Sequence, residues 1–274
     1  MKEIIFWNGR FIRQDEAQAP ILTPGFLYGW GLFETMRSCN NKIVYFHRHL
    51  SRIKNSCKLI GLEFPYSIDK LKRIINRTVK INGFSDAYVR LTLWKSKKCT
   101  DVLVITKKYR PPSFQRYRNG FRASISIFKQ GEGSFLARLK TANYLLYRLS
   151  YLQAKNKGFD EAIIINNRGY ITEGSHSNIF FAKNNAMFTP GLECGCLDGI
   201  TRRVVFDLAK RYNIKTYEGN FTLLDLYGAD EAFLTNSLIG IIPLASIEKR
   251  QIARGSKKDK LTNFLMERYR CLLK

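Results

Sequence analysis

The sequence is 274 residues long, 45% hydrophobic and 13% aromatic, as expected of an ordinary globular protein that buries one large core or two smaller ones. Its net charge of +24 invites a nucleic-acid interpretation, but the basic residues are scattered and lack a zinc-finger, aromatic-stacking or helix-turn-helix pattern. We therefore expect a solvated basic face that steers anionic substrates, and no nucleic-acid partner.

Short strands alternate with helices over residues 1–112, which predicts an N-terminal α/β layer domain. The pairs Asn8-Gly9 and Asn40-Asn41 predict the turns of two hairpins. Amphipathic spacing predicts two helices, and apolar patterning predicts two further strands. The hairpin strands are expected at 4–7 with 11–12 and at 34–38 with 43–46, the helices at 47–61 and 68–80, and the later strands at 88–93 and 102–106.

Pro111, Pro112 and the polar, basic residues after them predict a linker over 113–122 and a strand-rich C-terminal domain over 123–274. The strands of this second domain are expected at 123–128, 161–165, 170–172, 177–182, 187–189 and 231–235. Its helices are expected at 141–157, 202–212, 223–228 and from Leu261 onward.

The six cysteines do not make a disulfide framework, and reduced thiols fit the cytoplasm. Cys194-Gly-Cys196 lacks the spacing of a zinc knuckle. His47 and His49, without partner carboxylates in the sequence, are interpreted as helix-entry and packing residues, so no metal site is expected. No secretory signal or membrane-spanning apolar run is visible, and we expect a cytoplasmic protein without a membrane partner.

Lys140 stands immediately ahead of the predicted helix 141–157. The positive end of a helix disfavours an ammonium group and favours the neutral amine, which a lysine needs to attack an aldehyde. Among 46 Lys and Arg residues, however, a single lysine is more often solvated surface, so the hypothesis depends on the residues elsewhere in the chain.

Those residues match the needs of pyridoxal 5′-phosphate: a lysine for its aldehyde, a carboxylate for its pyridine nitrogen, an anion site for its phosphate and a wall against solvent. Glu173 interrupts a strand pattern between aromatic and apolar residues. A buried carboxylate is costly without a cation, and a protonated pyridine nitrogen supplies one. The alternative is a solvated strand glutamate.

Residues 197–201 are interpreted as a turn that leads into a helix with Thr201 as its N-cap, and a phosphate site is predicted there. Arg202 and Arg203 in the first turn oppose the helix dipole unless an anion normally occupies that end. The amides of Ile200 and Thr201 and the Thr201 hydroxyl would bind it.

Two further segments are suited to complete this phosphate site. The polar break 235–237 after an apolar strand could close the opposite side, and Arg52 could bind the phosphate through two nitrogens. Each of these residues also has an ordinary interpretation as a cap, a turn or a surface charge.

In their order along the chain, these residues resemble the fold-type IV pyridoxal-phosphate enzymes, the class IV aminotransferase family. The resemblance extends over nearly the whole sequence. Its motifs are Gly25 to Thr35, His49 to Ile53 with Arg52, Lys140-Thr-Ala-Asn143, Glu173 to Phe180, Gly199-Ile-Thr201-Arg202, and Thr235-Asn236-Ser237 followed by Pro243.

The resemblance implies an α+β, two-domain enzyme, usually a homodimer, with the cofactor in the interdomain cleft. It implies that Lys140 bonds to the cofactor and moves a proton between Cα and C4′, and that Glu173 binds the pyridine nitrogen. The other implied cofactor-binding residues are Arg52, Tyr144, Ile200, Thr201, Asn236 and Ser237. The implied substrate-binding residues are Tyr28, Phe33, Tyr88, Arg90 and Leu238.

Within the family we expect an aminotransferase that acts on a branched-chain or related amino acid and 2-oxoglutarate, because Tyr88 and Arg90 resemble the branched-chain pattern. The alternative is 4-amino-4-deoxychorismate lyase, which forms 4-aminobenzoate, because the segment 235–243 looks more like the lyases. A D-amino acid aminotransferase and a basic binding protein without activity are further alternatives. The segment 93–101 is shorter than the substrate loop of many members, and Trp30 stands where an acidic or small residue is common.

Overall fold

The computed structural model describes residues 3–131, 133–252 and 260–273. The chain divides into two compact units, of which unit 1 comprises Met1–Pro111 with Leu139–Asn143, and unit 2 comprises Pro112–Arg138 with Tyr144–Lys274. The expected linker 113–122 instead contains helix α4 (Phe114–Asn119) and the start of strand β7 (Phe121–Ile125). Ser113 accounts for the helix, because its hydroxyl caps α4 by accepting a hydrogen bond from the backbone of Arg116.

Unit 1 is built on a six-stranded sheet in the order β2-β1-β6-β5-β3-β4, in which all neighbours run antiparallel. Its strands are β1 (Ile4–Trp7), β2 (Arg10–Arg13), β3 (Gly31–Cys39), β4 (Lys42–Ile43), β5 (Ala87–Lys95) and β6 (Thr100–Lys108). Both predicted hairpin turns are confirmed, and Asn8, Gly9, Asn40 and Asn41 all have positive φ. The second hairpin is shorter than expected, because helix α2 already begins at Phe46.

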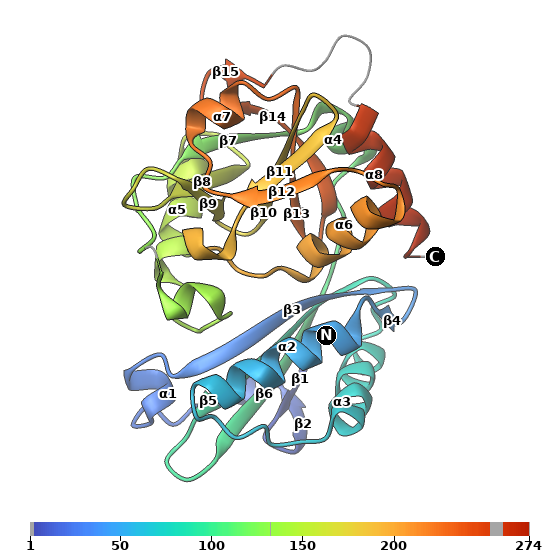
Figure 1. Ribbon diagram of the computed structural model, residues 1–274. Coiled ribbons are helices and arrows are strands. Elements are labelled where there is room, and N and C mark those ends of the chain that lie inside the picture. Colours follow the sequence, from blue (N-terminus) through green and yellow to red (C-terminus); the bar gives the residue numbers. More distant parts are fainter. Residues whose placement is uncertain (1–2, 132, 253–259, 274) are drawn as a thin grey trace. The chain divides into compact units, whose positions relative to one another are not determined.

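The helices of unit 1 lie against one face of this sheet (Figure 1). They are α2 (Phe46–Leu59) and α3 (Ile68–Ile81), and both confirm predicted helices. Two short helices, η1 (Gln14–Glu16) and α1 (Pro24–Leu27), precede them in the chain. Leu50 of α2 and Leu71 of α3 are completely buried in one core with Leu32 and Met36 of β3. Burial of each such side chain contributes about 1.5–3 kcal/mol to folding.

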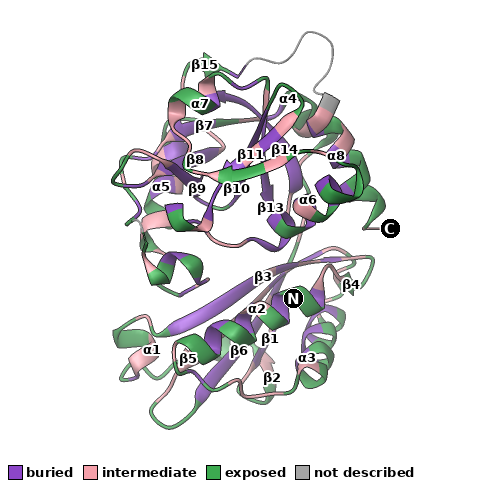
Figure 2. Ribbon diagram, viewed as in Figure 1, coloured by how far each residue is buried: buried purple, intermediate pink, exposed green. Residues whose placement is uncertain are grey.

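Strand β3 has two chemically different faces, because successive side chains of a strand point to opposite sides. Leu32, Glu34 and Met36 share the side that packs on the helices, where Leu32 and Met36 join the core and Glu34 contacts α2. Phe33 and Thr35 share the other side. Figure 2 shows β3 buried along most of its length.

The prediction that a helix starts at Thr141 is wrong, because helix α5 spans Leu145–Asn156. Residues Leu139–Asn143 belong to unit 1, where Leu139 enters the core. The backbone of this segment pairs with β3: Phe33 N donates to Lys140 O at 2.8 Å, and Ala142 N donates to Gly31 O at 2.9 Å. This long-range pairing competes with the local helical pattern and holds the segment extended.

Unit 2 contains a mixed nine-stranded sheet in the order β12-β11-β10-β13-β14-β7-β8-β9, with β15 paired to β14. Its remaining strands are β8 (Glu161–Ile165), β9 (Ile171–Gly174), β10 (Asn178–Lys183), β11 (Ala186–Pro190), β12 (Thr216–Gly219), β13 (Glu231–Asn236), β14 (Gly240–Ile247) and β15 (Arg250–Gln251). The meander from β8 to β11 and strand β13 confirm the predicted strands. Strands β12, β14 and β15 were not predicted.

The longer helices of unit 2 are α5, α6 (Ile200–Arg211) and α8 (Lys260–Cys271), and the short ones are η2 (Phe135–Arg138), η3 (Leu192–Cys194) and α7 (Leu223–Tyr227). Helix α5 packs on β8 and β7, whereas α6 and α8 contact each other and β13. The core of this unit includes Ile163, Ile179 and Leu234. Among the described residues, no helix is long and apolar enough to cross a membrane.

Candidate active site

In unit 1, three ionisable side chains form a buried cluster between β3 and α2. Arg52 donates to Glu34 through Nε and Nη2, each at 2.7 Å, so the guanidinium binds the carboxylate in a bidentate ion pair. His49 Nδ1 lies 2.7 Å from Glu34 Oε2. Glu34 and His49 are almost completely buried, and Arg52 is 11% exposed. The expectation that His49 lacks a partner carboxylate is therefore wrong, because the packing of α2 on β3 brings Glu34 to it.

This cluster fixes the charge of its members. Burial alone would raise the pKa of Glu34, but the Arg52 guanidinium and His49 outweigh it and lower the pKa from 4.5 to about 2. Burial lowers the pKa of His49, so the imidazole is neutral near neutral pH and Nδ1–H donates to the carboxylate. The cluster therefore holds the Arg52 side chain in one orientation.

On the opposite face of β3, the predicted lysine meets two of the predicted substrate residues. Lys140 Nζ lies 4.6 Å from the centre of the Phe33 ring, and the Arg90 guanidinium carbon lies 3.7 Å from the same centre. Arg90 Nε also donates to Thr92 Oγ1 at 3.2 Å. Tyr88 is two residues before Arg90 on β5 and shares its face. Unit 1 thus gathers an amine and a guanidinium around one aromatic ring.

The environment of Lys140 differs from the one expected from sequence. Helix α5 begins five residues after it, so the lysine does not precede a helix N-terminus directly. Its half-buried side chain lies over the aromatic ring of Phe33, and the pairing of the Lys140 backbone with β3 keeps it there.

In unit 2, the predicted ring-nitrogen ligand Glu173 is buried on β9. Its carboxylate accepts hydrogen bonds from the Tyr147 hydroxyl at 3.0 Å and from Asn178 Nδ2 at 3.3 Å. Burial, reinforced by the nearby carboxylate, raises the pKa of Tyr147 far above its usual range, so the phenol stays protonated and donates. Glu173 is not the solvated strand glutamate that was the alternative.

Tyr144 lies beside this carboxylate group. Its ring stacks on Tyr147 with the ring centres 4.9 Å apart, and its hydroxyl donates to the carbonyl of Ser175 at 2.8 Å. Tyr147 follows Tyr144 by three positions along α5 and its N-cap, the spacing at which side chains of a helix meet.

The predicted phosphate turn leads into helix α6, but its N-cap is Gly199 and not Thr201. Gly199 has no side-chain cap, and a Cβ atom there would come within 2.0 Å of Asn178 Oδ1. Thr201 therefore lies in the first turn of the helix. Its buried hydroxyl has no hydrogen-bond partner within the part of the chain that the structure describes.

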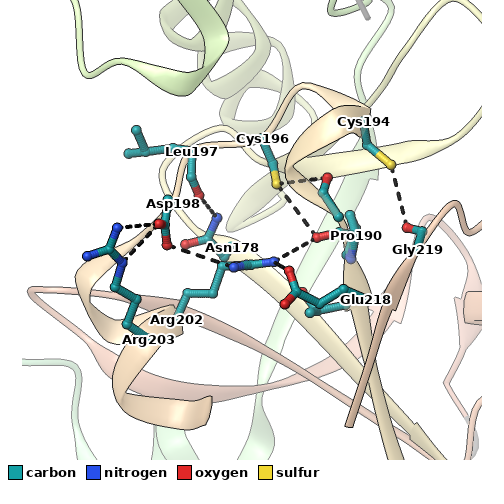
Figure 3. Close-up of polar contacts among 12 residues, drawn as sticks. Asn178, Pro190, Cys194, Cys196, Leu197, Asp198, Arg202, Arg203, Glu218 and Gly219 are labelled. Atoms are coloured by element: carbon teal, nitrogen blue, oxygen red, sulfur yellow. Dashed lines mark hydrogen bonds and ion pairs between the residues drawn. The ribbon is translucent and has the colours of Figure 1, made fainter. Parts of the chain in front are cut away.

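The two arginines at the start of α6 already have carboxylate partners, so they do not require a bound anion (Figure 3). Arg202 contacts Glu218 at 2.5 Å and donates to the carbonyl of Pro190 at 3.1 Å. Arg203 donates to Asp198 through Nε at 2.9 Å. The expected need for an anion at this helix end is therefore wrong, because Asp198 is close to both arginines in sequence and Glu218 of β12 reaches Arg202 from elsewhere in the fold.

The remaining predicted residues have the following surroundings. Asn236 Oδ1 accepts from the backbones of Leu238 and Ile239 at 2.9 Å, and its Nδ2 donates to the carbonyl of His176 at 3.0 Å. Ser237 and Leu238 lie half-buried in this turn. Tyr28 is 73% exposed at the end of α1.

Sequence reasoning missed two residues around Glu173 in unit 2. Tyr147 and Asn178 are the donors to Glu173, and both are recognisable afterwards from sequence. Tyr147 follows Tyr144 at helical spacing, and Asn178 lies five residues after Glu173 in the same motif. The six cysteines are free thiols, and no group of three or more possible metal ligands occurs among the described residues.

Comparison with known proteins identifies the class. Residues 31–247 match the amino-transferase class IV family. A putative branched-chain-amino-acid aminotransferase of Methanocaldococcus jannaschii is 30% identical over 275 residues, which cover 97% of this chain and 95% of that protein. An aminodeoxychorismate lyase of Bacillus subtilis is 30% identical over 278 residues, which cover 97% of this chain and 94% of that protein.

The fold agrees with this family. The structure of a branched-chain aminotransferase from the archaeon Thermoproteus uzoniensis, solved with norvaline, is similar with a TM-score of 0.89 and 30% identity, covering 100% of this chain and 95% of that one. The chain therefore belongs to the class IV aminotransferases, and the predicted α+β, fold-type IV architecture is confirmed. It is an enzyme of that family.

Proposed function

We propose that this enzyme is a pyridoxal-phosphate-dependent aminotransferase that transfers an amino group between a branched-chain or related amino acid and 2-oxoglutarate. The observation that carries the proposal is the pair of cations around Phe33, because Lys140 offers an amine for a carbonyl carbon and Arg90 offers a fork for a carboxylate. In the proposed reaction the carbonyl is the cofactor aldehyde, and the carboxylate is that of the amino acid or the oxo acid. The M. jannaschii relative supports the substrate class.

The residues of unit 2 fit the cofactor. The Thr201 hydroxyl is buried without a partner among the described residues, beside the uncapped first turn of α6, and phosphate oxygens accept hydrogen bonds from such groups. Ile200, Thr201 and Ser237 would hold the phosphate, Glu173 the ring nitrogen, and Tyr144 and Asn236 would complete the site. Arg52 of unit 1 is proposed as a further phosphate ligand. The bound cofactor supplies an electron sink for the substrate Cα.

Each side chain then has a defined task. The Glu173 carboxylate, oriented by Tyr147 and Asn178, would favour the protonated form of the ring nitrogen. With the cofactor bound, Lys140 Nζ would carry the proton to and from the substrate Cα. Arg90 orients the substrate carboxylate, with Tyr88 and Phe33 lining the same sheet face. Arg52, which Glu34 orients through two hydrogen bonds, would donate to the phosphate.

A second candidate is 4-amino-4-deoxychorismate lyase, because the B. subtilis lyase is as similar as the M. jannaschii aminotransferase. The two reactions differ in their product. An aminotransferase leaves the cofactor in its amine form after the first oxo acid departs, whereas a lyase regenerates the aldehyde form in each turnover.

The deciding experiment mixes the cofactor-loaded protein with L- and D-amino acids and follows the visible absorbance, alongside 4-aminobenzoate formation from aminodeoxychorismate. We expect leucine, valine and glutamate to convert the cofactor to the amine form. Many turnovers of 4-aminobenzoate without any such conversion would establish the lyase instead. Borohydride reduction and peptide mapping should place the cofactor on Lys140, and a label on another lysine would refute that assignment.

A further inference from the structure

Glu161, which has no part in the proposed chemistry, is a buried carboxylate at the start of β8. Its side chain is 4% exposed, and Ala162, Ile163 and Ile164 after it are completely buried. The Ala162 backbone donates to Oε1 at 2.9 Å. A carboxyl group at such a position requires several hydrogen-bond partners to offset its lost hydration.

The other donors all belong to one short turn, Ser175–Ser177, which joins β9 to β10. Ser177 Oγ donates to Oε2 at 2.8 Å, and the His176 backbone donates to Oε2 at 3.3 Å. Ser175 Oγ makes a short hydrogen bond to Oε1. Both carboxylate oxygens are therefore bound to the turn, and charge-assisted hydrogen bonds of this kind fix geometry strongly.

The turn is also packed tightly against Glu161. A Cβ atom on Gly174 would lie 3.1 Å from Glu161 Cδ and 2.3 Å from Ser177 Oγ, so glycine is needed there. Gly174 N donates to Ser177 O at 2.6 Å and Ser175 N donates to Ala162 O at 2.9 Å, which closes the turn onto β8.

Four candidate site residues depend on this turn. Its carbonyls accept hydrogen bonds from the Tyr144 hydroxyl at 2.8 Å, through Ser175, and from Asn236 Nδ2 at 3.0 Å, through His176. Glu173 and Asn178, which bond to each other, flank it in sequence. The position of the turn therefore sets the position of all four.

We propose that Glu161 is a positioning residue for the unit 2 residues of the proposed site. Its carboxylate fixes the Ser175–Ser177 turn, and the turn holds Glu173, Asn178, Tyr144 and Asn236 in their mutual arrangement. The role rests on the proposed function, because these four residues act on the cofactor.

The test replaces Glu161 by glutamine, which keeps the size but presents an NH2 group to backbone N–H donors. The matched control is Glu248→Gln, because Glu248 Oε1 also accepts a backbone N–H in unit 2, from Ile125 at 2.8 Å on β7, which pairs with the opposite edge of β8 from the turn. Both variants are compared with the wild type by thermal melting, absorbance of the bound cofactor and kcat. Amide hydrogen exchange of residues 174–178 is measured in the cofactor-free protein.

For Glu161→Gln we expect exchange at Gly174 and Ser175 to accelerate about tenfold or more, the cofactor absorbance to change, and kcat to fall at least about tenfold. Glu248→Gln should leave all three unchanged. Ser177→Ala, which removes one donor and keeps the carboxylate, should shift them in the same direction by less. It provides the test if Glu161→Gln does not fold.

Three outcomes would overturn the proposal. The first is wild-type absorbance and kcat in folded Glu161→Gln, and the second is unchanged exchange of the turn amides. The third is failure of the wild-type protein to bind pyridoxal phosphate, which would refute the proposed function itself. In that case the exchange data on the cofactor-free protein would still show whether Glu161 fixes the turn.

Discussion

Two buried glutamates of this protein have different partners and therefore different tasks. Glu34 meets the permanent charge of Arg52 through two hydrogen bonds. Glu173 receives hydrogen bonds from a phenol that burial keeps protonated and from an amide. Uncharged donors such as these orient a carboxylate without neutralising its charge, which suits a ligand of a cationic ring. The charge of Glu34 instead orients an arginine.

At Glu34 this difference predicts a pH-dependent loss of stability. The pKa of Glu34 in the folded protein is about 2, below its ordinary value of 4.5. The ionised Glu34 therefore contributes its full stabilisation at a pH above its ordinary pKa. This contribution is lost as the pH falls through the pKa of Glu34 in the folded protein. We expect Glu34→Gln to lower the free energy of unfolding by about 3 kcal/mol near neutral pH, because it leaves Arg52 without its counter-charge.

Urea denaturation of wild type and variant between about pH 7 and about pH 2.5 measures this effect, and the difference should shrink toward the acid end. Glu16→Gln is the control, since Glu16 is exposed and its contact with Arg13 is a surface pair worth at most about 1 kcal/mol. A pH-independent difference for Glu34→Gln would show that packing, and not charge, is responsible.

At Glu173 the expected effect is on rate. We expect Glu173→Gln to keep the cofactor bound but to slow removal of the substrate Cα proton, because an amide does not favour the protonated ring. The loss of a charge-assisted contact costs roughly 1.5–3 kcal/mol, or about one to two decades in rate. Stopped-flow absorbance with a saturating amino acid measures the step.

Tyr147→Phe removes one donor from Glu173 and should slow the same step by less. Glu231→Gln is a control in the same unit, since Glu231 accepts the backbone N–H groups of Leu261 and Thr262 at the start of α8. If Glu173→Gln reacted at the wild-type rate, the ring nitrogen would have another ligand.

Among the elements, β3 organises unit 1. Two consecutive residues of this strand contact three different side chains of the proposed site. Phe33 N binds the Lys140 carbonyl, the Phe33 ring contacts Lys140 and Arg90, and the Glu34 carboxylate binds Arg52. Because the strand lies inside a six-stranded sheet, these contacts are fixed together.

Displacing the end of β3 should therefore disturb the lysine. A Cβ atom on Gly31 would come within 2.9 Å of the Leu93 carbonyl and of Trp94 Cβ, so Gly31→Ala forces β3 away from β5. Gly31 also accepts the Ala142 backbone N–H. We expect a loss of about 1–3 kcal/mol in stability and markedly weaker cofactor binding, measured by denaturation and by absorbance titration.

Gly131→Ala serves as the control, because the nearest atom to its Cβ would be 4.0 Å away and its φ is not positive. If Gly31→Ala bound cofactor as tightly as Gly131→Ala, the attachment of Lys140 to β3 would have no part in cofactor binding.

The same elements explain what sequence could predict. The turns at Asn8-Gly9 and Asn40-Asn41 were predictable because the tolerance of a left-handed backbone is a property of those residues themselves. The start of α5 was not, because Thr141 and Ala142 pair with a strand that is more than a hundred residues earlier in the chain. Likewise, the partner of Arg202 on β12 cannot be recognised from the α6 sequence alone.

At the scale of the whole molecule, the segment around α1 presents an apolar surface that one chain leaves exposed. Leu22, Phe26 and Tyr28 are exposed by 67%, 65% and 73%. Burial of a large apolar side chain contributes about 1.5–3 kcal/mol, so several of them together favour association strongly. We propose that a second copy of the chain covers this segment, as expected for a homodimer.

The prediction is that the protein is a dimer at micromolar concentration and that Leu22→Glu combined with Phe26→Glu makes it monomeric, because charged groups on a buried apolar interface lose hydration without gaining a partner. Light scattering after size-exclusion chromatography measures the mass. Leu224→Glu is the matched control, since Leu224 on α7 is 76% exposed but distant from α1 in sequence. If the double variant remained a dimer, or if Leu224→Glu also became monomeric, association would not depend specifically on the α1 segment.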